Sequence, residues 1–180
     1  EDPSRTVLGA EQERWLDGAL AASRARWTVL AQAVMFAPMI EGSPGSPRIW
    51  TDAWSGYPPA RERLLGSLRR HRVANPVVLT GDIHSFWVNA VPDARGQVVA
   101  AELVTSSIAT SNTHRPERLA LNPHIAFHDG EHCGYVRCEA DAARLRADVI
   151  GIDDMRDPRS GRKVLASFEV ADGDPQPRRL

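Results

Sequence analysis

The first half of the chain alternates between helical and strand-like hydrophobic patterns. Residues 9–24 and 61–72 carry apolar side chains at the three- and four-residue spacing of one helix face. These stripes are formed by Trp15, Leu16, Ala19, Leu20 and Ser23 in the first segment and by Leu64, Leu65 and Leu68 in the second. Residues 27–36 and 77–80 are nearly continuous apolar runs with β-branched members, which predict buried strands, the first of them central in a sheet. This order of helices and strands is typical of an α/β fold.

The second half is predicted to be rich in β-strands. Residues 97–108, 134–140, 145–152 and 163–171 are short strand-like segments separated by turn residues, without a long helical pattern between them. Residues 38–59 are rich in Gly, Pro and Ser and predict a long irregular loop, anchored by Trp50, Trp54 and Tyr57. Loops of this length inside a domain often line functional sites.

Composition and charge exclude several classes of function. The chain has 180 residues, of which 42% are hydrophobic, so we expect one soluble domain without a membrane span. Lys and Arg number 22 against 23 Asp and Glu, which predicts no nucleic-acid-binding patch. The two cysteines lack the spacing of a disulfide framework. The chain begins with Glu1 and carries no export signal, so we expect a piece of a longer protein.

A possible metal site follows the second strand, where residues 81–84 read Gly-Asp-Ile-His. Gly81 allows the backbone to turn sharply, and Asp82 and His84 are two residues apart, a spacing that lets both side chains reach the same side. A carboxylate and an imidazole can bind one ion or two adjacent ions. The four residues alone leave a second interpretation open, in which Asp82 caps the next segment and His84 is an ordinary packed or surface histidine.

Five blocks in order along the chain carry a resemblance that covers most of residues 5–170. They read LGAEQERWLDGAL, WTVLAQAVMFAP, TDAWSGYPPARERLL, NPVVLTGDIHSFWVN and NPHIAFHDGEHCGYVRCE. Together they resemble the C-terminal half of PhoD-like alkaline phosphatases, members of the calcineurin-like metallophosphoesterase superfamily. Several ordered blocks are far more specific than a single Gly-Asp-x-His.

The resemblance implies that residues 1–180 are the C-terminal portion of a four-layer αββα sandwich, an α/β fold whose N-terminal part is absent. It implies a metal cluster of calcium and iron, with Asp82 and His84 as ligands, that hydrolyses phosphoesters. The remaining ligands would come from the missing N-terminal half of the same protein, which is therefore a required partner. Family members are typically exported, so the resemblance implies an extracytoplasmic or secreted location.

Two departures from the family pattern lie within the matched blocks. Ser55 stands where the family usually has the Asp of AWDGYP, and Ala33 stands where a second glutamine is common. Asp52 is the nearby acid that could replace the lost carboxylate, although an exposed loop acid is the more ordinary interpretation. Gln32 lies in an apolar strand and requires a hydrogen-bond partner, so we expect it beside the site without a catalytic role.

Three competing interpretations remain. His128, His132, Cys133 and Cys138 carry zinc-binding groups, but their spacing does not organise a tetrahedral site. Ser85 could act as a nucleophile, but no activating base or oxyanion signature accompanies it. The chain could also be a truncated remnant without catalysis, serving as a binding or structural module.

Overall fold

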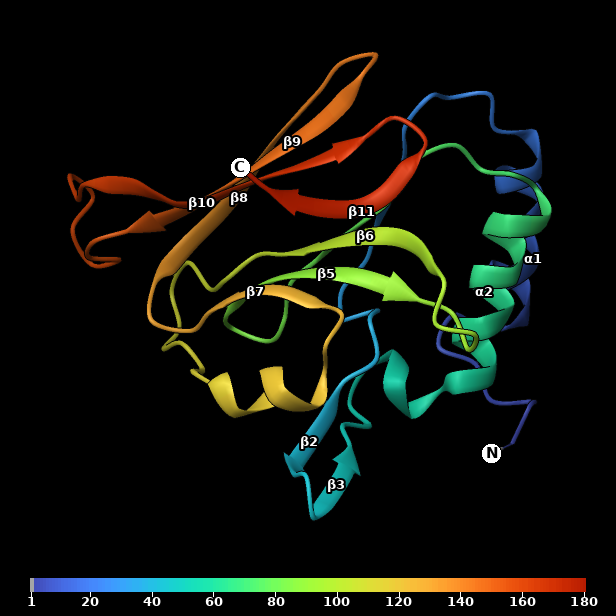
Figure 1. The fold of residues 1–180 in the computed structure, drawn as a ribbon, viewed down its shortest axis with the longest axis horizontal. Helices are drawn as coiled ribbons and strands as arrows, with labels where there is room; N and C mark the ends of the chain where they lie inside the picture. Colours follow the sequence, from blue (N-terminus) through green and yellow to red (C-terminus); the bar gives the residue numbers. More distant parts are fainter. Residues whose placement is uncertain (1) are drawn as a thin grey trace.

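The computed structural model describes residues 2–180 and contains two β-sheets packed face to face, with two α-helices on the outer side of one sheet (Figure 1). The first sheet has five strands in the order β1-β4-β6-β5-β7. Their bounds are β1 (Thr28–Ala31), β4 (Pro76–Thr80), β5 (Phe86–Pro92), β6 (Val98–Val104) and β7 (Ile125–Asp129). β1, β4 and β6 are parallel, whereas β5 is antiparallel to both of its neighbours, so β7 has the direction of β6.

The second sheet is antiparallel throughout, in the order β11-β10-β9-β8. Its strands are β8 (Cys133–Ala140), β9 (Arg144–Ile152), β10 (Arg162–Ala171) and β11 (Asp174–Arg179). One apolar core fills the space between the sheets, with Phe86 and Leu103 from the first sheet and Phe168 and Val149 from the second. The predicted β-rich second half is therefore confirmed, and its strands bury one face against the first sheet.

Two helices, α1 (Ala10–Ala22) and α2 (Pro58–Arg70), cover the other face of the first sheet. Leu20, Leu65 and Leu68 are buried there with Val78 of β4. The α/β class is confirmed, and the described residues form three layers of the predicted sandwich: helices, mixed sheet and antiparallel sheet. The predicted buried position of Trp15 is wrong, because its side chain is 67% exposed on the outer surface of α1. No helix among residues 2–180 has the length and hydropathy needed to span a membrane.

A buried carboxylate fixes the centre of the first sheet. Glu102 on β6 is fully buried, and its two oxygens accept four hydrogen bonds. Phe36 N (2.6 Å) and Thr80 Oγ1 (2.7 Å) donate to Oε1, and Ala37 N (2.9 Å) and Asn89 Nδ2 (2.9 Å) donate to Oε2. A buried charge is tolerated when every lone pair has a partner, and these four donors come from β4, β5 and the segment after β1.

The strand predicted over residues 27–36 is shorter than expected, and its last residues turn toward Glu102. β1 ends at Ala31, although Gln32 N still donates to Leu79 O (3.0 Å) and Gly81 N donates to Ala33 O (3.1 Å). Further along the chain, the backbone N–H groups of Phe36 and Ala37 bond to Glu102 and not to a neighbouring strand. The prediction of a central strand is also wrong for the described residues, where β1 lies at the edge of the sheet next to β4. Met35, Phe36 and Ala37 are nevertheless buried, so the apolar run marks core residues in an irregular segment.

The predicted loop over 38–59 contains regular structure. A two-stranded hairpin is formed by β2 (Ile40–Ser43) and β3 (Ser46–Ile49), and a 3₁₀ turn, η1 (Trp54–Gly56), precedes α2. Trp54 is buried as expected of an anchor, with Phe36 edge-on to it at 5.0 Å between ring centroids. The sequence patterns missed β5, β7, β11 and a second 3₁₀ helix, η2 (Pro116–Leu121).

Replacing Glu102 with Gln should lower the free energy of unfolding by about 2–4 kcal/mol. Either orientation of the amide turns its NH₂ group toward two of the four donors, which leaves them unpaired in the core. Chemical denaturation measures the change. Glu131→Gln, at an exposed position, is the control and should change stability by less than about 0.5 kcal/mol. Equal stability of the two variants would contradict the buried network.

Acid should destabilise the second sheet through Asp148 on β9. Burial raises the pKa of this carboxyl, but hydrogen bonds from Ser167, Arg137 and Arg146 outweigh burial and lower the pKa to about 2 from an ordinary 3.8. The folded pKa is below the unfolded one, so the stabilisation is present above pH 3.8 and is lost as the pH falls toward 2. Asp148→Asn should therefore remove about 1–2 kcal/mol of the pH dependence of unfolding between about pH 4 and 2, measured by denaturation at each pH.

Candidate functional site

The carboxyl ends of four strands, β1, β4, β6 and β7, lie at one edge of the first sheet. The chain leaves β4 at Thr80 and enters β5 at Phe86, but β6 lies between these strands. Residues 81–85 must therefore cross the end of β6, and Thr105 N donates to Thr80 O (2.9 Å) beneath them. Crossings of this kind at the carboxyl edge are frequent places for ligand sites in open α/β sheets.

The crossing loop holds two non-glycine residues in the left-handed region, Asp82 with φ 71° and His84 with φ 56°. Ile83 between them is buried with Trp87 and Val104. Both left-handed residues are exposed. The turn therefore buries the side chain of Ile83 and leaves the side chains on either side of it at the surface. A non-glycine residue in this region costs about 1–2 kcal/mol, less for Asp and His, and such conformations gather at functional sites.

Hydrogen bonds fix this loop from three directions. Ile83 N donates to Gly81 O at 2.9 Å, and Thr113 N donates to His84 O at 3.0 Å. Buried Ser85 accepts from Trp87 Nε1 at 2.8 Å. Since the hydroxyl of Ser85 is enclosed, it has no access to a substrate and carries no nucleophilic role.

Asp82 and His84 offer a carboxylate and an imidazole from one strained turn. Within residues 2–180, neither side chain has a hydrogen bond to another residue, and no group of three or more His, Cys, Asp or Glu side chains is placed to hold a metal ion. The described chain therefore brings two candidate donors to the sheet edge. A complete coordination sphere requires further donors.

The other candidates lie in separate surroundings. Gln32 follows β1 and is fully engaged, donating from Nε2 to Thr80 Oγ1 (2.9 Å) and accepting from Trp54 Nε1 (3.0 Å). It thus braces the end of β4 immediately before the crossing loop. Asp52 is exposed on the segment before η1. Ser55, which is expected from the sequence to replace an aspartate, is buried and accepts from Met39 N at 2.8 Å.

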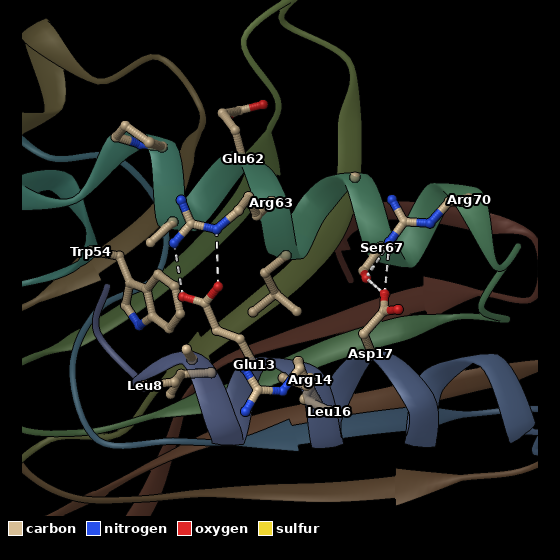
Figure 2. Close-up of a pocket in the computed structure, with 15 residues that line it drawn as sticks. Leu8, Glu13, Arg14, Leu16, Asp17, Trp54, Glu62, Arg63, Ser67 and Arg70 are labelled. Atoms are coloured by element: carbon tan, nitrogen blue, oxygen red, sulfur yellow. Dashed lines mark hydrogen bonds and ion pairs between the residues drawn. The ribbon is translucent and has the colours of Figure 1, made fainter. Parts of the chain in front are cut away.

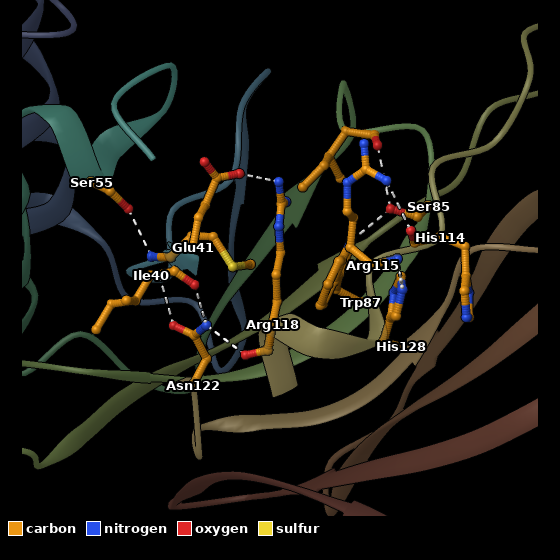
Figure 3. A network of polar contacts seen from close by, with 12 residues as sticks. Ile40, Glu41, Ser55, Ser85, Trp87, His114, Arg115, Arg118, Asn122 and His128 are labelled. Atoms are coloured by element: carbon orange, nitrogen blue, oxygen red, sulfur yellow. Dashed lines mark hydrogen bonds and ion pairs between the residues drawn. The ribbon is translucent and has the colours of Figure 1, made fainter. Parts of the chain in front are cut away.

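A stack of three rings stands beside the crossing loop (Figure 3). Buried Trp87 stacks on His128 at 3.7 Å, and His128 stacks on His114 at 5.5 Å, measured between ring centroids. His128 Nδ1 donates to Phe86 O (3.1 Å) and its Nε2 accepts from Arg115 N (3.1 Å), which requires a neutral ring. Burial lowers the pKa of His128 more than its bond to Phe86 raises it, which agrees with this neutral state.

The remaining members of the His and Cys group have other partners. His132 Nδ1 lies 3.0 Å from Asp129 Oδ2, and the same carboxylate accepts from His132 N (2.9 Å). Cys133 is buried, with its Sγ 3.3 Å from Asn112 Oδ1, whereas Cys138 is exposed on β8. His132 thus stabilises the turn before β8, and Cys133 packs at the start of that strand. Likewise His124 Nε2 lies 2.9 Å from Pro38 O, and burial lowers the pKa of His124.

A cavity of about 750 Å³ lies elsewhere, between α1 and α2 (Figure 2). Ion pairs bridge it: Arg63 Nη2 lies 2.9 Å from Glu13 Oε1, and Arg70 Nη2 lies 2.7 Å from Asp17 Oδ1. The hydrogen bonds from Ser67, His71 and Arg70 lower the pKa of Asp17 to about 2. Since these charged groups pair with each other across the gap, we assign the cavity to helix packing.

Comparison with known proteins gives consistent results. A family model described as PhoD-like phosphatase matches residues 1–149. Alkaline phosphatase D of Bacillus subtilis (strain 168) is 36% identical over an alignment of 177 positions that covers 93% of this chain and 30% of that protein. A solved structure titled "Structure of PhoD" is 34% identical, with a TM-score of 0.89, and the match covers 99% of this chain and 36% of that chain. The chain thus spans about a third of the length of these relatives.

Glycine at position 84 should be more stable than alanine by about 1 kcal/mol, because only glycine adopts a φ of 56° without strain from a Cβ atom. Thermal or chemical unfolding of His84→Gly and His84→Ala measures the difference. Ser111 is the control: it is exposed and outside the left-handed region, so Ser111→Gly should be no more stable than Ser111→Ala. An alanine variant at 84 as stable as the glycine variant would contradict the strained turn.

Proposed function

Because the chain belongs to the family of PhoD-like phosphatases, we propose that it forms part of a metal-dependent phosphoesterase in which Asp82 and His84 are metal ligands. The single observation that supports this role is the strained turn of residues 81–85. Two left-handed residues flank one buried isoleucine and expose a carboxylate and an imidazole at the carboxyl edge of the sheet. Strained backbone at two exposed positions of one turn is typical of a functional site.

The donor set fits the metals that the family implies. A carboxylate oxygen suits a hard ion such as calcium, and an imidazole nitrogen suits iron, so one turn can serve two different ions. We propose calcium and iron on these grounds. When bound, such ions offset the charge of the phosphoryl oxygens and lower the pKa of a coordinated water.

The residues of this chain hold and orient the two donors. The buried side chain of Ile83 anchors the turn to the core, and the backbone N–H of Thr113 holds the carbonyl of His84 by a hydrogen bond. Gln32 and Glu102 both bond to Thr80 and so hold the last residue of β4 in place. Two donors bind a metal weakly, so the rest of the coordination sphere comes from the part of the relatives that this chain does not span. Asp52 remains a candidate for lining the site.

The substrate class that this proposal implies is a phosphate ester, and the family pattern favours an extracytoplasmic or secreted enzyme. The alternative is a non-catalytic module that keeps the two sheets. This alternative draws on the observation that no group of three metal-binding side chains assembles within residues 2–180.

A chimera tests the proposal. The matching segment of Bacillus subtilis alkaline phosphatase D is replaced by this chain, which is 36% identical to it, and hydrolysis of p-nitrophenyl phosphate is measured with calcium and iron supplied. The chimera should be active. His84→Ala should lower turnover by more than about a hundredfold and reduce bound metal in elemental analysis. Mutation of a residue that only supports a metal ligand lowers activity by about 10–100-fold, and loss of the ligand itself should cost more.

The control is His71→Ala, which removes a histidine from the end of α2 and should leave turnover unchanged. The 180-residue chain by itself should show no appreciable hydrolysis, because it offers two donors. Full turnover in the His84→Ala chimera would remove this residue from the site. A folded but inactive chimera would favour the non-catalytic module.

A further inference from the structure

The rings of Trp87, His128 and His114 form a stack that leads from a buried to an exposed residue (Figure 3). Trp87 is fully buried, His128 is half-buried, and His114 is exposed. The planes of neighbouring rings differ by only 19° and 22°, so the three rings are nearly parallel. His114 is therefore the outermost ring of the stack, offset from His128, and it belongs to an exposed residue.

The inner part of the stack is rigid. Both ring nitrogens of His128 are engaged, one with Phe86 O and one with Arg115 N, so this ring has a fixed orientation. The backbone of His114 is also confined, because a Cβ atom at Gly130 would lie 2.4 Å from His114 Cα and 2.6 Å from Thr113 O. A ring held from below and along its backbone is a preorganised platform, and preorganisation lowers the entropic cost of binding.

The platform lies close to the two candidate ligands. Thr113 N donates to His84 O at 3.0 Å, and His114 is the next residue. Bond lengths and this hydrogen bond limit the separation of the His84 and His114 Cα atoms to on the order of 10 Å. The exposed cation of Arg115 follows directly, with its Nη1 3.2 Å from His114 O. A phosphoester held at the crossing loop would thus have its alcohol group within reach of the His114 ring.

We propose that His114 is a stacking subsite for the alcohol group of the substrate, and that this group is a planar aromatic ring, as in an aryl or nucleoside phosphate. The assignment of this ring site to the substrate rests on the proposed function. A flat imidazole face recognises another flat π-system and gains little from a polyol, which has no ring to stack. The same site thereby favours aromatic phosphoesters over glycerol-type esters.

Binding to the 180-residue chain tests the subsite without hydrolysis or metal. Adenosine, which has the ring and lacks the phosphate, is titrated against histidine-labelled protein, and the ring signals of His114 are followed by NMR. Adenosine should cause a saturable upfield shift, and ribose should cause none. His114→Ala should weaken adenosine binding about fivefold to tenfold, the low end of the range for stacking on an aromatic side chain.

His114→Phe should keep the affinity, because it keeps an aromatic face, and Ser111→Ala, an exposed change on the same loop, should behave as the unmodified chain. Absence of a saturable shift, an equal response to ribose, or unchanged affinity in His114→Ala would each overturn the subsite. The binding titration does not depend on turnover. An inactive chimera would therefore count against the proposed function without affecting the evidence for the stacking subsite. In an active chimera, His114→Ala should lower the preference for p-nitrophenyl phosphate over glycerol 3-phosphate by the same factor.

Discussion

The structure depends on one buried negative charge, the carboxylate of Glu102. It binds β4 and β5 to β6 through side chains, and it binds the segment after β1 through two backbone N–H groups. The helical layer is attached to the same point, because Arg61 of α2 donates from Nε to the carbonyl of Phe36 at 2.9 Å. One peptide unit therefore links a buried anion to a buried cation across two layers. A buried charge is stable only while all four of its hydrogen-bond donors are in place. The carboxylate therefore favours the one arrangement of sheet and helices that brings these donors together.

Local periodicity was sufficient to predict both α-helices and several of the strands, but not the positions at which strands are interrupted. The helices were predicted within a few residues from apolar spacing, and so were β4, β6, β8, β9 and β10. β1 was predicted too long, because the backbone N–H groups of Phe36 and Ala37 leave the sheet and bond to Glu102, which lies about 70 positions after β1 in the sequence. Trp15 fits the helical stripe but is exposed, since spacing alone does not tell which neighbour a face will meet. β5 and β7 were missed, although Asn75 to Asn89 and Asn122 to Glu139 were recognised as family blocks.

The candidate site shows the same division between local and distant information. The Gly-Asp-x-His turn was visible because its residues are adjacent in the sequence, and the structure adds the left-handed backbone that exposes both side chains. His114 was not singled out, since its importance comes from stacking on His128 and from the bond between Thr113 and His84. Ser55 was recognised as a departure from the family, and its hydroxyl now receives the N–H of Met39. The hydroxyl thus serves the backbone of the segment that leads into the β2–β3 hairpin.

The order of strands in the first sheet has a consequence for how the chain folds. β6 comes after β5 in the sequence but lies between β4 and β5 in the sheet. The crossing loop therefore reaches its final shape only when a later segment has inserted between the two strands that the loop connects. The strained turn therefore depends on pairing between segments that are not neighbours in the sequence. The chemically important part of the molecule is thus an outcome of completed folding, and a chain stalled before β6 inserts would have its strands without its site.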